Sequence, residues 1–389
     1  MEQVELLRVL EMSCVDHLGS SPLESPVWKL CRNIANWGCG PELLLKFRRL
    51  SHSRKEFPHL DGILKEQLGL LFSGGSLHFV DIQPDDASLT LLKNIVSGDK
   101  VHPMTSLDQL ASRLSEQRRM FALVHPSAMH DPLYVLQVTL RDDMPPTIDD
   151  ILADQDASSR PSAPSLAILY AILSLEPALA GLDLGSTLIK MAVHHLQTTA
   201  HIHNFFTLSP IPRLRSSLQQ AVTNPAPKGH VHAHAHLPAG VEEHWIAALP
   251  PGIVHGIQTH LEGTPLQSEE SEEADDEAEG RGGGGGALTA RGLDRFMEEA
   301  DLSQPQVAAL TRQVVQTYLQ QPRLDPVANF HMRNGAAAYR ILLKADDKPL
   351  RLQQSYGHMV SYHYDLTRVT ARRAAFLAAP PQVCTAWSD

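Results

Sequence analysis

The sequence predicts an α+β fold, in which an all-α N-terminal helical domain precedes a larger α/β domain. Two observations carry this prediction. Apolar residues recur at helical spacing through the first part of the chain, as at Leu6, Val9 and Leu10. After a glycine-containing turn, short aliphatic strands alternate with helices. We therefore place the two domains at residues 1–71 and 72–389.

The strands of the second domain are expected where short aliphatic runs stand between turn residues. Residues 121–124 and 133–140 predict two neighbouring strands joined by a hairpin loop. A polar loop at residues 154–164 precedes a further strand at residues 166–173. A glycine turn then starts a helix that extends to about residue 197, because its apolar residues share one helical face.

The rest of the chain is interrupted by a segment of unusual composition. A strand at residues 204–208 ends at two prolines, which cannot donate to a sheet ladder. Residues 225–292 are rich in Pro and His, then acidic, then polyglycine, and we expect a low-complexity, largely disordered insert. A helix at residues 304–319 leads through a connection into residues 329–335. Residues 340–343 and 360–366 supply further strand and helix.

Composition limits the class of protein. The chain has 389 residues, of which 43% are hydrophobic and 20% charged, so it can bury a substantial core. Eight acidic residues between positions 269 and 279 account for most of the net charge of −11, and the rest is nearly neutral. No strongly basic face is indicated, so we expect no nucleic-acid partner.

The cysteines and the apolar runs indicate the compartment. The four cysteines are too few and too scattered for a disulfide framework, which favours a reducing compartment. No apolar stretch approaches the roughly 20 residues that a membrane helix needs. The first and last residues lack the features of a targeting signal. We expect a cytoplasmic protein with no membrane partner.

The turn Gly181-Leu182-Asp183-Leu184-Gly185-Ser186 stands between a strand and a helix. Backbone N–H groups of a glycine turn, together with the positive end of a helix dipole, suit a pyrophosphate. A purely structural turn is the alternative, because left-handed turns require glycine anyway. The turn resembles the CoA-pyrophosphate loop of the GNAT acetyltransferase fold without matching its usual spelling.

Two further segments offer reactive side chains. Ser209 follows a strand and precedes Pro210, at the kind of strand end where ligands commonly lie. His331 lies among apolar and amide groups that can adjust its pKa for proton transfer. A serine that satisfies a backbone group in a turn, and a buried structural histidine, are the alternatives.

In combination these segments resemble the malonyl-CoA decarboxylase family. The resemblance rests on an ordered set of motifs: Val101-His102-Pro103, Gly181-Leu182-Asp183-Leu184-Gly185, Ser209-Pro210-Ile211-Pro212, and Asn329-Phe330-His331 with Asn334-Gly335. It covers about residues 71–224 and 293–375. Each motif alone is weak, whereas the ordered set is specific.

The resemblance implies a GNAT acetyltransferase-like α/β catalytic domain, a helical domain that makes homo-oligomers, and no metal or organic cofactor. The substrate it implies is malonyl-CoA and the product acetyl-CoA, and the family also allows a mitochondrial or peroxisomal location. Ser209 and His331 carry over as the catalytic pair, with Asp183 in support where the family commonly has glutamate. The implied substrate-binding residues are Gly181, Gly185, Ser186, Asn329 and Tyr362. The family's Asn-Tyr-x-Tyr segment appears here as Ser361-Tyr362-His363-Tyr364.

The implied chemistry needs no metal. Loss of CO2 from a malonyl thioester leaves an enolate, whose oxygen must be stabilised and whose α-carbon must be protonated. Our hypothesis is that His331 delivers the proton while Ser209 fixes the carboxylate, and the two roles could be reversed.

Other features are open to simpler interpretations. The alternating histidines at positions 230–236 could bind a metal, but low-complexity drift explains them as well. Arg213 and Arg215 could meet CoA phosphates or serve only a helix surface. An acetyl-CoA-dependent N-acetyltransferase would use the same scaffold, although it has no need of a carboxylate-positioning serine. A non-catalytic CoA-binding subunit is a third hypothesis.

Overall fold

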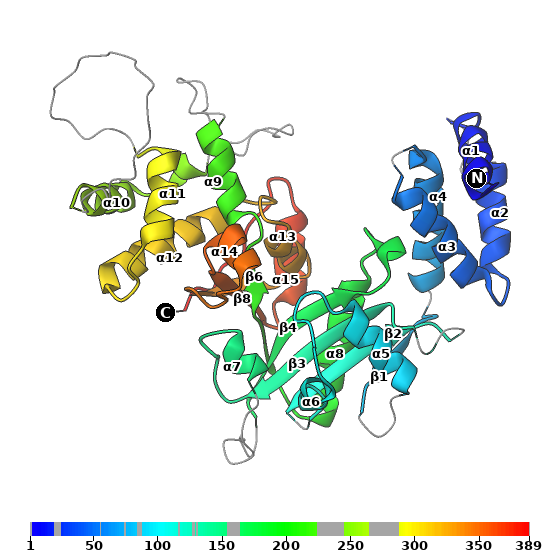
Figure 1. The fold of residues 1–389 in the computed structure, drawn as a ribbon, viewed down its shortest axis with the longest axis horizontal. Coiled ribbons are helices and arrows are strands. Elements are labelled where there is room, and N and C mark those ends of the chain that lie inside the picture. The colour runs from blue at the N-terminus through cyan, green and yellow to red at the C-terminus, as the bar shows by residue number, and fades with distance from the viewer. Residues whose placement is uncertain are drawn as a thin grey trace. The chain divides into compact units, whose positions relative to one another are not determined.

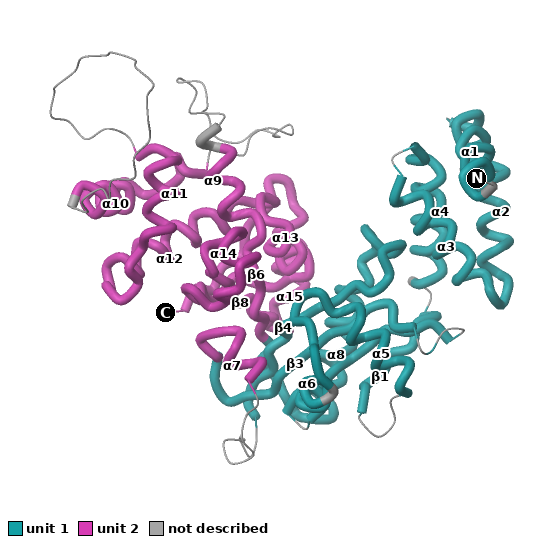
Figure 2. The backbone as a smooth tube through the Cα atoms, in the orientation of Figure 1, with its two compact units in different colours: residues 1–144, 154–205 teal, residues 145–153, 206–389 magenta. Residues whose placement is uncertain are grey.

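The computed structural model describes residues 2–18, 25–54, 56–73, 75–83, 88–115, 117–126, 129, 131–153, 164–223, 245–263 and 288–388. The chain forms two compact units, drawn in different colours in Figure 2. Unit 1 comprises residues 1–144 and 154–205, and unit 2 comprises residues 145–153 and 206–389.

Unit 1 begins with four helices, α1 (Glu2–Val15), α2 (Pro26–Ala35), α3 (Gly40–His52) and α4 (Pro58–Ser73) (Figure 1). The first three pack against α4, which buries Leu60, Leu64 and Leu68 at helical spacing. The predicted helical region is confirmed. The domain boundary predicted between residues 71 and 72 stays a prediction; α4 ends at Ser73.

The sheet of unit 1 is an antiparallel run of four strands in the order β1 (His78–Asp81), β2 (Arg118–Val124), β3 (Tyr134–Arg141) and β4 (Leu166–Ser174). Phe121 lies opposite Leu136, so the two strands predicted as neighbours do pair. The unit also contains α5 (Leu89–Gly98), α6 (Leu107–Ser112) and the 3₁₀ helix η3 (Pro177–Leu179). Helix α8 (Leu184–Thr199) packs on β2 and β3 through buried apolar side chains such as Leu188. It is the helix predicted after the glycine turn.

In unit 2 the central strand is β8 (Met359–Tyr364), which pairs antiparallel with both β6 (Ser209–Pro210) and β7 (Ala337–Leu342). Strand β5 (Asn204–Thr207) precedes β6 in the chain. The helices of this unit are α7 (Asp149–Leu152), α9 (Leu214–Thr223), α10 (Pro251–Gly263), α11 (Ala290–Glu299), α12 (Pro305–Leu319), α13 (Pro326–Arg333), α14 (Pro349–Ser355) and α15 (Val369–Leu377). The α+β class is confirmed, and α12 matches the helix predicted at residues 304–319.

Two differences from the sequence expectation concern unit 2. The segment that contains His331, for which the sequence analysis predicted no element, is helix α13, because Asp325 caps it and Pro326 occupies its first turn. Within the expected insert, residues 246–263 form a 3₁₀ turn η4 (Ile246–Ala248) and helix α10, which buries Ile257.

The most biased parts of the expected insert, residues 224–244 with the alternating histidines and residues 264–287 with the acidic and glycine runs, lie outside the described residues. So do residues 154–163 of the predicted polar loop. In the part of the chain that is described, no helix combines the length and the apolar character needed to cross a membrane.

Candidate active site

Ser209 and His331 meet in unit 2, although 122 residues separate them in the chain. The Oγ atom of Ser209 lies 3.1 Å from Nε2 of His331, within hydrogen-bond distance. Their exposed fractions are 5% and 6%, so the pair lies almost entirely out of solvent. The structure therefore brings together the two side chains that the sequence analysis paired.

Helix α13, which carries His331, is fixed at both ends. The carboxylate of Asp325 accepts hydrogen bonds from the backbone N–H groups of Val327 and Ala328 at 2.9 and 3.0 Å. At the other end Gly335 adopts a φ of +82°, and a Cβ there would lie 2.1 Å from the carbonyl oxygen of Val369. Only glycine fits such a position, so the sequence defines where this short helix stops.

Two tyrosines of β8 contact the imidazole of His331. Alternate residues of a strand share one face, which places Tyr362 and Tyr364 side by side. The hydroxyl of Tyr364 lies 2.9 Å from Nδ1 of His331. The ring of Tyr362 stacks on the imidazole, with centroids 4.6 Å apart and planes at 24°. The imidazole is therefore held both at its second nitrogen and over its face.

Thr207 continues the network beyond the serine. The Ser209 hydroxyl donates to Oγ1 of Thr207 at 2.9 Å, and the same oxygen accepts the N–H of Tyr362 at 3.1 Å. The ordered contacts thus extend from Tyr364 through His331 and Ser209 to Thr207. All four side chains are buried, and a buried polar network holds its members in one arrangement when each finds a partner.

Burial also sets the protonation of the site. Desolvation lowers the pKa of His331 from 6.5 to about 3, so the imidazole is neutral at neutral pH. Burial raises the pKa of Tyr362 well above its usual value of 10, and its hydroxyl has no hydrogen-bond partner among the described residues. Burial likewise raises the pKa of Asp325, while the hydrogen bonds it accepts act in the opposite direction. A neutral imidazole offers one N–H and one lone pair, which suits proton transfer.

The sequence analysis missed two members of this network, Thr207 and Tyr364. It singled out Tyr362, whose ring is fully buried against His331. Strand alternation in Ser361-Tyr362-His363-Tyr364 could have indicated that Tyr364 shares that face. Asn329 lies half-buried on α13. Substrate binding by Asn329 and Tyr362 stays a prediction.

The remaining predicted residues form a turn in unit 1. Gly181 has a φ of +77°, and Asp183 stands at the N-cap of α8 without a side-chain hydrogen bond to the helix. Gly185 and Ser186 lie buried in its first turn, whereas the Asp183 side chain is exposed. A Cβ on Gly181 would lie 2.8 Å from Nζ of Lys65 on α4. The turn therefore combines a left-handed glycine, a helix N-terminus and a neighbouring ammonium group.

Two arginines of the helical region hold that turn. Arg48, whose exposed fraction is 1%, donates to the carbonyl oxygens of Ala178 and Ala180, the latter at 2.7 Å. Arg49 pairs with the carboxylate of Glu176, which also accepts the N–H of Ala178 at 2.9 Å. The approach to the glycine turn is thus anchored by side chains of α3.

For Arg213 and Arg215, which follow the proline pair, the sequence allows either contact with CoA phosphates or a helix-surface role. Arg215 pairs with Glu298 at 2.8 Å and with Asp294 at 3.9 Å, and its guanidinium lies 5.0 Å from the ring centroid of Tyr356. These contacts favour the structural role for Arg215. The side chain of Arg213 is exposed.

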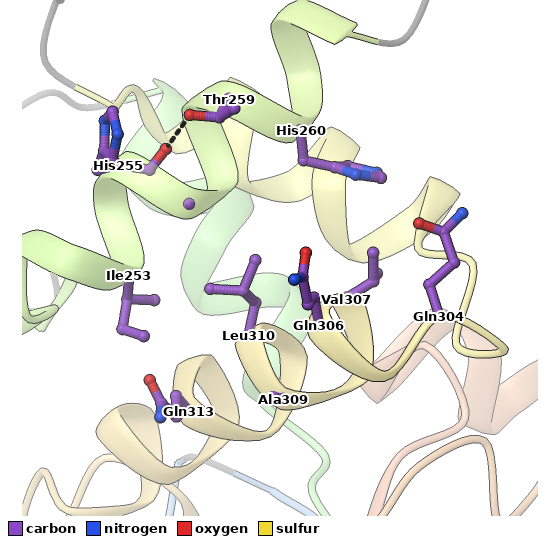
Figure 3. A pocket seen from close by; sticks show the side chains of 11 residues that line it. Ile253, His255, Thr259, His260, Gln304, Gln306, Val307, Ala309, Leu310 and Gln313 are labelled. Atoms are coloured by element: carbon purple, nitrogen blue, oxygen red, sulfur yellow. Dashed lines mark hydrogen bonds between the residues drawn. The ribbon is translucent and has the colours of Figure 1, made fainter.

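A separate hollow lies between α10 and α12 (Figure 3). Its walls include Ile253, Thr259, Val307 and Leu310, and glutamine side chains also line it. None of the residues predicted for the site lines it. We therefore keep the candidate site at Ser209 and His331.

Comparison with known proteins agrees with the family resemblance of the sequence. Residues 75–386 match the model of the malonyl-CoA decarboxylase C-terminal domain. The mitochondrial malonyl-CoA decarboxylase of Anser anser anser is 26% identical over 336 residues, which cover 82% of this chain and 59% of that protein. The enzyme of Rattus norvegicus is 28% identical over 333 residues, covering 83% and 61%. The chain thus matches about three fifths of the length of these relatives.

Solved structures share the fold. The malonyl-CoA decarboxylase of Rhodopseudomonas palustris superposes with a TM-score of 0.65 and 23% identity, covering 98% of this chain and 84% of that one. The enzyme of Cupriavidus metallidurans gives a TM-score of 0.66 and 23% identity, covering 92% and 80%. Because the family model spans most of the sequence, and these folds agree with it, this chain belongs to the malonyl-CoA decarboxylase family.

Proposed function

We propose that this chain converts malonyl-CoA to acetyl-CoA and CO2, with Ser209 and His331 as its catalytic residues. The observation that carries the proposal is the 3.1 Å contact between Ser209 and a buried, neutral imidazole. Family membership supplies the substrate class, because the relatives that match carry the name malonyl-CoA decarboxylase.

The network suits the two demands of the reaction. The carboxylate that leaves as CO2 must be held in position, and the α-carbon of the resulting enolate then needs a proton. In the proposal the Ser209 hydroxyl turns from Thr207 to hold the malonyl carboxylate, and His331 protonates the enolate. Little water reaches either group, since both are more than nine-tenths buried, and exclusion of water strengthens each of these contacts.

The glycine turn of unit 1 is proposed to bind the pyrophosphate of CoA. Gly185 and Ser186 lie in the first turn of α8, at the positive end of its helix dipole, and Lys65 lies beside Gly181. Both features favour an anion. A supporting role for Asp183 rests on the family resemblance and its position at the same N-cap.

The test is to incubate the purified chain with malonyl-CoA and to measure acetyl-CoA and CO2. Ser209→Ala and His331→Ala should each lower kcat by about 100-fold or more. Matched controls are Ser217→Ala, which removes a buried hydroxyl bonded to the Leu214 carbonyl, and His358→Asn, which removes another buried histidine. Both controls should keep most of the activity.

Three outcomes separate the hypotheses. Acetyl-CoA formation that fails only in the Ser209 and His331 variants supports decarboxylation at this site. Undiminished turnover by a folded His331→Ala variant would refute the assignment. Acetyl transfer to an amine without decarboxylation would favour the N-acetyltransferase hypothesis, and CoA binding without either reaction would favour a non-catalytic subunit.

We also propose that the helical region mediates self-association, in a cytoplasmic protein. Exposed apolar residues of α1, Leu6, Val9 and Met12, have exposed fractions of 47%, 57% and 66%. Leu6 also lines a shallow apolar groove with Phe47 of α3. Such side chains are typical of a contact surface. Light scattering should give an oligomer for the wild type and a smaller species for a Val9→Lys/Met12→Lys variant.

A further inference from the structure

The phenol of Tyr364, a described residue, contacts a ring nitrogen of His331, and the proposed reaction leaves this contact without a role. Its oxygen lies 2.9 Å from Nδ1, opposite the nitrogen that meets Ser209. The side chain is 3% exposed. The rings of Tyr364 and His331 meet edge to face at 74°, while Tyr362 stacks on the imidazole. Tyr364 is thus held against Nδ1 by packing as well as by its hydroxyl.

The surrounding hydrogen bonds favour one tautomer of the imidazole. A phenol donates strongly and accepts weakly, because its oxygen lone pair is delocalised into the ring, so Tyr364 O–H to Nδ1 is the preferred direction. On the other side the Ser209 hydroxyl donates to Thr207, which leaves its oxygen free to accept from Nε2. Both ends of the imidazole therefore place its single proton on Nε2.

We propose that Tyr364 sets this tautomer and replaces the proton that His331 gives to the substrate. The inference rests on the proposed decarboxylation and assigns the proton donor within it. Tyr364 touches no reacting atom, so it is a positioning and relay residue rather than a catalytic one.

The bond between the α-carbon and the carboxylate breaks, CO2 leaves, and its bonding electron pair remains as the enolate of the thioester. The α-carbon takes the proton of His331 Nε2 while Nδ1 takes the phenolic proton of Tyr364. The imidazole stays neutral and the tyrosine becomes a phenolate. After acetyl-CoA leaves, a proton from water enters at Nε2 and the Nδ1 proton returns to the phenolate.

Burial explains why a second donor is required. An imidazolium would be the stronger acid, but desolvation keeps His331 neutral down to a pKa of about 3. A neutral imidazole that lost its only proton would become an anion in a buried site. The phenol of Tyr364 prevents this, because it supplies a proton at the opposite nitrogen in the same event.

The first experiment determines the tautomer without turnover. In protein labelled with ¹⁵N-histidine, the two ring nitrogens of His331 have distinct chemical shifts when one is protonated, and a His331→Asn variant identifies its signals. We expect Nε2 to carry the proton and Nδ1 to be unprotonated at pH 7. A protonated Nδ1 would overturn the proposal, and this result does not depend on whether a Tyr364 variant folds.

The second experiment measures the relay. Tyr364→Phe should lower kcat about 100-fold with little change in KM. The matched control Tyr356→Phe also loses a buried hydroxyl bond, to Asp294, and should keep kcat. When the rate is measured in mixtures of H2O and D2O, its dependence on the D2O fraction should indicate two protons transferred in the rate-limiting step (two protons in flight) for the wild type. The same measurement on Tyr364→Phe should indicate one. A purely structural tyrosine would lower the rate without changing that number.

The outcomes distinguish the relay from the proposed function. Decarboxylation with one proton in flight, or full activity of Tyr364→Phe, overturns the relay and leaves decarboxylation intact. No decarboxylation by the wild type refutes both. The expected tautomer together with a change from two protons to one establishes the relay.

Discussion

His358 gives the stability of unit 2 a pH dependence that a single substitution removes. Its side chain is 1% exposed, Nδ1 accepts the backbone N–H of Lys344 at 3.0 Å, and Nε2 has no hydrogen-bond partner among the described residues. Burial, with a smaller contribution from the Lys344 charge, lowers its pKa from 6.5 to about 3. The folded chain therefore keeps this imidazole neutral where the unfolded chain protonates it.

Proton linkage determines the sign and size of this pH dependence of the unfolding free energy. Between pH 6.5 and 3 the unfolded chain binds one more proton at this position, so the free energy of unfolding falls as pH decreases. The slope is about 1.4 kcal/mol per pH unit for one group. At pH 5 the wild type should have lost about 2 kcal/mol relative to pH 7 on account of His358 alone. Above pH 7 the group contributes no pH dependence.

The variant His358→Asn isolates this contribution. Asparagine retains an acceptor for the Lys344 N–H and does not titrate in this range. Urea unfolding of both proteins at pH 7, 6 and 5 gives a difference in unfolding free energy in which all other titrations cancel, including that of His331. Between pH 7 and pH 5 the variant should become about 2 kcal/mol more stable relative to the wild type. A difference that does not change with pH would refute burial of a neutral imidazole at this position.

Three further substitutions test the scaffold. Gly335→Ala should lower the melting temperature by several degrees in calorimetry, because the new Cβ meets a backbone carbonyl at 2.1 Å; Gly252→Ala, where nothing lies within 4 Å, should not, and equal effects would contradict the argument. Arg48→Met should cost about 3 kcal/mol in urea unfolding, because the buried carbonyl group of Ala178 and the partly buried one of Ala180 lose a charged donor; a stability within error of wild type would refute it. Asp325→Ala should cost about 1 kcal/mol through loss of the α13 cap and should lower kcat with it, whereas the exposed Asp347→Ala should change neither.

The sequence was informative where local chemistry decides the structure. The strands β2 and β3 and the helix α8 follow from aliphatic runs and apolar periodicity, because these patterns determine which face can be buried. The pairing of Ser209 with His331 followed from the ordered family motifs, since no local pattern relates residues 122 positions apart.

The sequence was least informative where a contact depends on tertiary geometry. Tyr362 and Tyr364 are equivalent in a strand pattern, and only the position of α13 decides that one stacks on the imidazole while the other bonds its nitrogen. Helix α10 went unpredicted because the biased composition on either side obscured its apolar residues. The start of α13, by contrast, could have been predicted from Asp325 and Pro326, because an N-cap residue followed by a proline is typical of the first turn of a helix.

The arginines of α3 have a consequence for any shortened version of this protein. Arg48 and Arg49 satisfy carbonyl and carboxylate groups that precede the glycine turn, so helix α3 belongs to the support of that turn as much as to the helical bundle. A fragment starting at α5 would keep every residue of the turn and lose the donors that shape it. Deleting the helices to obtain a monomer would therefore change two properties at once, whereas surface substitutions on α1 would change association alone.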